Sequence, residues 1–160
     1  MIRRATTTDL PALLRLAEQA RQIMRQSGNM NQWVNGYPTE EAFLNDIHQQ
    51  GSFVVERDGA AVATFACLPS PEPTYAHIDG AWLNEADPYI VIHRIASTPD
   101  CHGIFSEMLE YCDRICPNIR IDTHRDNVIM RHLLSRHGFT YCGIIYLANG
   151  DERLAFQRIR

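Results

Sequence analysis

One segment in the second half of the chain constrains the fold more than any other, because it predicts a strand, a tight loop and a helix in direct succession. Residues 89–95 open with consecutive β-branched side chains, which is typical of a strand covered on both faces in the middle of a sheet. The run stops at Ser97, and beyond Gly103 apolar residues recur at helical spacing until Pro117, which cannot continue a helix. Such a unit is typical of an α/β fold.

Three further helices are predicted from apolar residues that recur every three or four positions. The first covers about residues 8–27, the second about 39–50 and the last 127–137, where Gly138 is suited to end it. We expect Thr8 to cap the first helix.

The remaining strands are predicted from turn chemistry and alternation. Asp58-Gly59 and Asn149-Gly150 supply the positive φ angles of tight turns, so each predicts a hairpin. Residues 119–122 alternate as a strand, whereas the prolines of 68–88 favour a long irregular loop, which is often functional. The element order predicts one α/β (α+β) domain over residues 1–160, with a mixed central sheet of about six to seven strands and about four flanking helices.

Charge and composition exclude several function classes. The formal net charge is −4, which argues against a nucleic-acid partner, because phosphate recognition usually needs a concentrated basic field. All 15 basic residues are arginine. Without lysine, a Walker phosphate loop, Schiff-base catalysis and a protein-kinase site all lack their essential side chain.

The cysteines and the amino-terminal residues indicate the cellular compartment. Five cysteines are an odd number, and the chain opens with arginines and polar residues rather than an apolar signal core. We therefore expect a cytoplasmic protein with free thiols, and no apolar run is long enough to predict a membrane helix. The sequence leaves the oligomeric state open, a homodimer included.

The loop between Ser97 and Gly103 is the strongest candidate for a ligand site. A helix that begins after it directs unpaired N–H groups and the positive end of the helix dipole into the loop, so a pyrophosphate can bind there without lysine. The alternative is that Gly103 merely permits a tight turn.

Two segments in the right order resemble the GNAT superfamily of acetyl-CoA-dependent N-acetyltransferases. Residues 92–109 (IHRIASTPDCHGIFSEML) are similar to the family's fourth strand, pyrophosphate loop and third helix. Residues 127–139 (NVIMRHLLSRHGF) are similar to the asparagine, helix and terminal Gly-Phe that follow its fifth strand. The resemblance covers essentially the whole chain and implies a GNAT fold.

The resemblance also implies roles for individual residues. Asn127 would bind the pantetheine arm or the region of the thioester, and Ile95 and Ser97 would offer main-chain groups to the pantetheine amides. The residues that would present amides to the pyrophosphate are His102, Gly103, Ile104, Phe105 and Ser106. Acetyl-CoA is thereby implied as co-substrate, and no metal is.

Three residues depart from the family's pattern. The loop motif Q/R-x-x-G-x-G/A keeps Gly103, but Asp100 stands at its first position and Phe105 at its last. An anion and a bulky side chain are expected to weaken pyrophosphate binding unless they point away. The tyrosine that many members use as general acid is replaced by Leu134.

The implied reaction is attack of a neutral amine on the thioester, which needs a base near pH 7 and a proton for the departing thiolate. His93, on the strand that delivers the cofactor, is the candidate base, with a packed structural histidine as the alternative. Ser135, Tyr141 and Tyr146 are candidate proton donors, each with an ordinary surface or packing role as the alternative.

Aromatic and sulfur-containing residues add two weaker hypotheses. Trp33, Tyr37 and Trp82 fall in loops that border the family's acceptor site and would form an aromatic wall, or else pin those loops to the core. Cys112 and Cys116 lie one turn apart, but no second pair has zinc-site spacing, so we predict buried small hydrophobes and no metal.

These observations lead to one function and one rival. The sequence predicts an acetyltransferase that acts on an amine of a small molecule or peptide, with no nucleic-acid or membrane partner. The rival, motivated by Asp100, Phe105 and Leu134, is a weak or inactive GNAT-fold module that binds acyl-CoA as a sensor or interaction partner.

Overall fold

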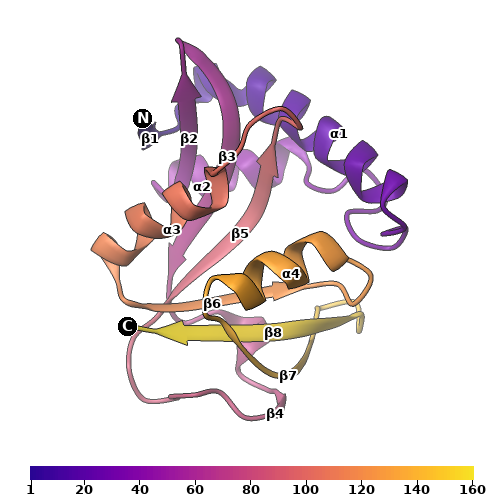
Figure 1. The fold of residues 1–160 in the computed structure, drawn as a ribbon, viewed down its shortest axis with the longest axis vertical. Coiled ribbons are helices and arrows are strands. Elements are labelled where there is room, and N and C mark those ends of the chain that lie inside the picture. The colour runs from indigo at the N-terminus through magenta and orange to yellow at the C-terminus, as the bar shows by residue number, and fades with distance from the viewer.

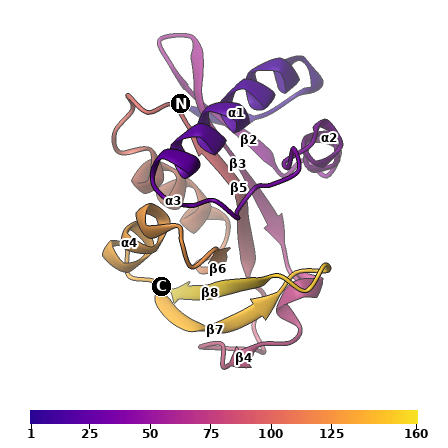
Figure 2. The same cartoon turned by 90° about the vertical axis from the view of Figure 1, so that its right-hand side faces the viewer.

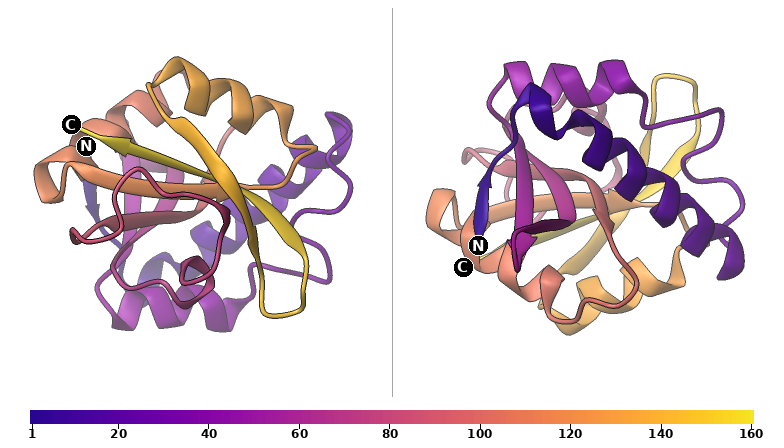
Figure 3. Two further views of the ribbon diagram at one scale, coloured as in Figure 1. Left: turned by 90° about the horizontal axis from the view of Figure 1, so that it is seen from below. Right: turned by 90° about the horizontal axis from the view of Figure 1, so that it is seen from above.

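A single eight-stranded sheet with four α-helices makes up the computed structural model, which describes residues 1–160. The strands are β1 (Ile2–Arg4), β2 (Ser52–Arg57), β3 (Ala60–Pro69), β4 (Asp79–Gly80), β5 (Ile90–Ser97), β6 (Asn118–Thr123), β7 (Thr140–Tyr146) and β8 (Glu152–Ile159). The helices are α1 (Leu10–Gln26), α2 (Glu40–His48), α3 (Ile104–Ile115) and α4 (Val128–Arg136), with short 3₁₀ turns η1 (Thr7–Asp9) and η2 (Pro73–Tyr75). Helices α1 and α2 lie on one side of the sheet and α3 and α4 on the other (Figure 3).

The strand order is β1-β2-β3-β5-β6-β8-β7-β4, and only β5 and β6 pair in parallel. The prediction of a mixed sheet is confirmed, but its strand number was too low. The extra strand is β4, a two-residue segment inside the proline-rich loop that pairs Gly80 with Gly143 of β7. A Cβ on Gly80 would lie 2.2 Å from the Cys142 carbonyl oxygen, so this close approach requires glycine. Two residues give no alternation, which is why the pattern does not reveal the strand.

The helix boundaries follow local capping. The prediction that Thr8 caps the first helix was wrong. Thr6 and Asp9 form a capping box around η1, and α1 begins at Leu10, directly after Asp9. Helix α4 is capped by Asn127, whose side-chain oxygen accepts from the Met130 amide at 3.0 Å.

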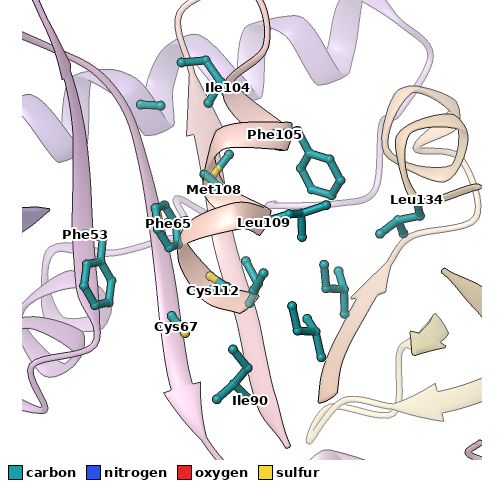
Figure 4. Packing of buried hydrophobic residues seen from close by; sticks show 14 of the residues in the cluster. Phe53, Phe65, Cys67, Ile90, Ile104, Phe105, Met108, Leu109, Cys112 and Leu134 are labelled. Atoms are coloured by element: carbon teal, nitrogen blue, oxygen red, sulfur yellow. The ribbon is translucent and has the colours of Figure 1, made fainter. Parts of the chain in front are cut away.

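The main core lies between the sheet and helices α3 and α4. Phe53 and Phe65 stack with ring centroids 5.3 Å apart, and Met108 and Leu134 are almost completely buried. Phe105 projects from the first turn of α3 toward Leu134 of α4 (Figure 4). Full burial of each such side chain contributes roughly 1.5–3 kcal/mol, so this packing holds α3 and α4 against β5 and β6.

Strands β5 and β6 separate soon after they begin. Their parallel pairing consists of Ile90 with Ile119 and Val91 with Arg120, after which the strands diverge, as Figure 1 shows. On its other edge β5 continues to pair with β3, with a bulge after His93. The divergence leaves an opening in the middle of the sheet.

Candidate functional site

A cavity of about 440 Å³ occupies the opening between β5 and β6. Its walls come from β5, β6, the start of α4, the loop 27–39 between α1 and α2, and the loop 147–151 between β7 and β8. The loop after α1 crosses beside β5 on its way to α2 (Figure 2). The volume is within the range of ordinary small-molecule sites.

Unpaired polar groups line this opening. Because β5 and β6 part after Val91, the main-chain groups of Ile92–Ile95 that point toward β6 have no strand partner. Thr123, at the end of β6, also lines the cavity, and its hydroxyl is buried without a hydrogen-bond partner. Buried polar groups are normally paired, so the opening is suited to an extended ligand that carries amide groups.

His93 faces the same cavity in company with a carboxylate. Its Nε2 lies 3.7 Å from Oε2 of Glu72, and the two side chains are only 21% and 23% exposed. Glu72 also accepts from the Thr74 hydroxyl at 2.8 Å. The His93 imidazole, followed by the Thr74 hydroxyl, outweighs the effect of burial and lowers the pKa of Glu72 to about 2. Glu72 is therefore an ionised carboxylate that can orient His93 and stabilise its imidazolium.

The proline-rich loop delivers Glu72 because aromatic residues fix it to the sheet. The buried Tyr75 donates its hydroxyl hydrogen to Asp122 of β6 at 2.6 Å, and burial together with that carboxylate raises the pKa of Tyr75 well above its ordinary value. Trp82 donates to the Tyr75 carbonyl, and the Arg120 guanidinium lies 4.0 Å from the Trp82 ring centroid. Asp122 and Glu72 thereby line the cavity from β6 and from the loop.

Arg94 occupies the bulge of β5 with φ of +52°, in the left-handed region that arginine rarely adopts. Its guanidinium donates to both carboxylate oxygens of Asp46 in α2 at 2.6 Å and to the Tyr37 hydroxyl at 2.8 Å. The side chains of Arg94 and Asp46 are 15% and 4% exposed. This buried pair joins the bulge to α2, and its hydrogen bonds offset the strain of the backbone.

The predicted pantetheine residue Asn127 lines the cavity at the start of α4. Its side-chain nitrogen donates to Oε1 of Gln32 at 3.0 Å, which connects α4 to the loop 27–39. Arg25 fixes that loop by donating to the carbonyl oxygens of Asn29, Gln32 and Trp33. Of the other predicted cofactor residues, Ile95 also lines the cavity.

The remaining predicted cofactor residues lie beyond the cavity, at the end of β5 and the start of α3. They are Ser97, His102, Gly103, Ile104, Phe105 and Ser106.

Gly103 is the N-cap residue of α3, with φ of +75°, and the amides of the next three residues make no hydrogen bond within the chain. Arg57 steadies the preceding loop by donating to the His102 carbonyl and to Glu107 at 3.1 Å each. The start of α3 thus presents the unpaired amides that an anion requires.

The three departures from the family pattern fall in different environments. Phe105 is 7% exposed and contacts the His137 ring edge-on at 5.0 Å, so its side chain faces the core rather than the loop. Asp100 is exposed in the loop. Leu134 is completely buried, and α4 supplies no hydroxyl at that position.

The candidate proton donors named from sequence do not line the cavity. Ser135 is exposed on α4, and Tyr141 is 53% exposed on β7. Tyr146 bonds Asp79 outside the cavity. Trp82, a proposed wall residue, is buried below Arg120 instead, whereas Trp33 and Tyr37 do line the cavity.

Sequence reasoning missed the acidic side of the site. Glu72 and Asp122 come from a loop and a strand that are distant in sequence, and Asp122 was assigned only to strand alternation. The signal that pointed toward Glu72 was the length of the proline-rich loop.

No group of three or more His, Cys, Asp or Glu side chains is arranged to hold a metal ion. None of the helices has both the length and the apolar character needed to cross a membrane.

Comparison with solved structures gives strong matches over the whole chain. A GNAT-family acetyltransferase from Streptococcus agalactiae is 32% identical, with a TM-score of 0.90, and the match covers 100% of this chain and 95% of that one. A ribosomal-protein-alanine N-acetyltransferase from Brucella melitensis is 21% identical, with a TM-score of 0.64 and coverage of 100% and 99%. A GNAT-like decarboxylase in complex with isobutyryl-CoA is 15% identical, with a TM-score of 0.68 and coverage of 99% and 98%. Neither the known family models nor the curated proteins contain a match to the sequence.

Proposed function

This chain belongs to the GNAT family of acetyltransferases, and from that premise we propose that it transfers an acetyl group from acetyl-CoA to an amine of a small molecule or peptide. The observation that carries the proposal is the early separation of β5 from β6, with His93 and Glu72 at the cavity that results. The five cysteines, all free, are compatible with a reducing cytoplasmic location.

The residues present fit the coenzyme along its length. The unpaired main-chain groups beyond Val91 suit the pantetheine amides, and the buried Thr123 hydroxyl is available to the thioester end. The free amides that follow Gly103 suit the diphosphate, and no lysine is needed there. Because Phe105 packs into the core, it does not enter the loop, and one objection to pyrophosphate binding is removed.

We assign the general base to His93. The unprotonated ring nitrogen of a neutral imidazole can accept a proton from the attacking amine. Glu72, ionised and 3.7 Å away, stabilises the imidazolium that forms. The amine nitrogen then attacks the thioester carbonyl, and positioning of the two reactants supplies much of the rate increase.

The carboxylates favour a positively charged acceptor. Glu72 lies 3.7 Å from His93, Asp122 also lines the cavity, and the charge of Arg94 is already balanced by Asp46, which leaves Arg153 as the one other arginine in the lining. A protonated amine is therefore attracted to this end before it gives up its proton. The ribosomal-protein-alanine acetyltransferase in the comparison acts on a protein, so peptides belong in the acceptor panel.

The test is direct measurement of binding and turnover. Purified protein is titrated with acetyl-CoA by calorimetry and then incubated with acetyl-CoA and a panel of alkylamines, diamines, amino-acid amides and short peptides. Because the protein contains five free cysteines, products are detected by mass spectrometry rather than with a thiol reagent. The expected result is saturable binding and one acetylated product class.

Two results would distinguish the acetyltransferase from the rival function, an acyl-CoA-binding module with weak or no activity. Ligand at 100 times its Kd stabilises the native state by about 2.7 kcal/mol, which is visible as a rise in Tm. A rise in Tm without turnover of any amine would favour a binding module, for which the fully buried Leu134 on α4 is the specific argument. No binding and no turnover would refute the enzymatic proposal.

A further inference from the structure

The departing thiolate needs a proton, and α4 does not provide the group for it. Leu134 is completely buried in the core, and Ser135 is exposed and lies outside the cavity. A donor supplied by the protein would therefore lie on another wall of the cavity. The hydroxyl-bearing residues among its lining are Tyr37, Thr74 and Thr123.

Chemistry selects one of these three hydroxyls. Thr74 already donates to Glu72, and the aliphatic hydroxyl of Thr123 is a much weaker acid than a phenol. We propose that Tyr37, in the loop between α1 and α2, is the residue that donates a proton to the coenzyme A thiolate. This assignment rests on the proposed function and names a further catalytic residue for it.

Hydrogen bonding leaves the Tyr37 hydroxyl hydrogen available. The hydroxyl oxygen accepts from Nη1 of Arg94 at 2.8 Å, so the oxygen is occupied as an acceptor while its hydrogen has no partner in the chain. The hydrogen bond from Arg94 also fixes the position of the phenol ring, and it keeps a positive charge beside the oxygen that gives up the proton.

Arg94 is in turn held from two sides, which makes it and Asp46 positioning residues. Its Nε and Nη2 donate to the two Asp46 oxygens at 2.6 Å, and both side chains are largely buried. The bulge that bears Arg94 directly follows His93 in β5. The general base His93 and Arg94, which binds the Tyr37 hydroxyl, are therefore adjacent in the same strand.

The proton and electron balance is complete within these groups. The amine lone pair forms the new C–N bond, the C–S bond breaks, and its electron pair goes to sulfur. Sulfur takes the Tyr37 hydroxyl proton and becomes the free thiol. His93 takes the amine proton, which returns to the Tyr37 oxygen through water, so the enzyme is regenerated.

The test compares Tyr37→Phe with Tyr146→Phe, using acetyl-CoA and the best amine from the panel. Tyr146 bonds Asp79 and does not line the cavity, so its variant is a matched loss of one phenol hydroxyl. General acids contribute 10²–10⁴-fold, and a thiolate is a fair leaving group, so we expect the single-turnover rate of Tyr37→Phe to fall roughly 100-fold. Acetyl-CoA affinity should stay within about twofold of the wild-type value, and Tyr146→Phe should behave as wild type.

A second variant separates proton donation from a structural role. Asp46→Asn should lower the rate in the wild-type background and have a smaller further effect in Tyr37→Phe, because part of its effect passes through the same hydroxyl. Rates are compared at a temperature at which circular dichroism shows every variant to be folded. Independent, additive effects of the two substitutions would overturn the assignment.

The assignment would also be overturned if Tyr37→Phe kept its single-turnover rate. A change in the KM for the amine alone would overturn it as well, because Tyr37 would then only line the acceptor site. If wild-type protein transfers no acetyl group to any amine, the proposed function itself fails, and this assignment fails with it.

Discussion

The Glu72–His93 pair predicts a specific loss of stability in acid. The pKa of Glu72 is lowered from 4.5 to about 2 in the folded chain, chiefly by His93. A group with a lowered folded-state pKa stabilises the fold above its unfolded pKa, and that stability is lost as pH falls through the folded value. The window for Glu72 is therefore pH 4.5 down to about pH 2.

The size of the effect follows from the same values. Each pH unit between the folded and unfolded pKa corresponds to about 1.36 kcal/mol, so the unscreened contribution is roughly 3 kcal/mol. Both side chains retain some solvent contact, 21% and 23%, and screening reduces the expected contribution to about 2 kcal/mol.

Urea unfolding at pH 5 and at pH 3 covers the upper part of this window and should register about half of the contribution, about 1 kcal/mol. Wild type should lose more free energy of unfolding over this interval than either Glu72→Gln or His93→Gln, because each substitution removes one member of the pair. Glu41→Gln, at the exposed first turn of α2, controls for the removal of one carboxyl. An equal loss of free energy of unfolding in wild type and in both variants would show that His93 does not stabilise the ionised Glu72 carboxylate.

Three further predictions follow from the structure. Replacing Asp46 with Asn leaves a buried guanidinium without its carboxylate and should lower the free energy of unfolding in urea by about 3–5 kcal/mol. The control is Asp9→Asn, in a more exposed bidentate pair, which should cost about 1 kcal/mol. Equal losses in the two variants would contradict the argument from burial. Gly103→Ala and Gly59→Ala place Cβ in open space at φ of +75° and +78°, so each should cost about 1 kcal/mol of stability; only Gly103→Ala should also weaken acetyl-CoA binding in calorimetry. His93→Gln should lower kcat by roughly 100-fold while acetyl-CoA affinity is unchanged, and a retained kcat would exclude His93 as the base.

Much of the fold was predictable because it depends on local patterns. The β-branched run of β5, the Gly103 loop and the apolar stripe of α3 are contiguous in sequence, and each has a local signal: residue type in the strand, glycine in the loop and helical spacing in α3. The turns at Asp58-Gly59 and Asn149-Gly150 were likewise visible as dipeptides. By contrast, β4 depends on the approach of Gly80 to Gly143, which are distant in sequence, and no local pattern records it.

The parts of the candidate site that lie in contiguous motifs were predictable, and the parts that distant residues build were not. Asn127 and Gly103 sit in contiguous motifs, so resemblance to a family locates them. Glu72 reaches the cavity only because aromatic residues of the proline-rich loop fix that loop to the sheet, whereas Asp122 lines it from β6. This long-range packing has no period, and a sequence pattern cannot place Glu72 beside His93.

The arginines explain how a chain without lysine still builds a defined site. A guanidinium has five donors in a planar fork and can bind several acceptors at once, which an ammonium cannot do with fixed geometry. Arg25 holds the loop after α1 through three carbonyl oxygens, and Arg57 holds the loop before α3 through the His102 carbonyl. Arg94 holds the bulge of β5 against α2. The positive charges of this chain thus position the walls of the cavity, and under the proposed function the main-chain amides at the start of α3 would bind the phosphate.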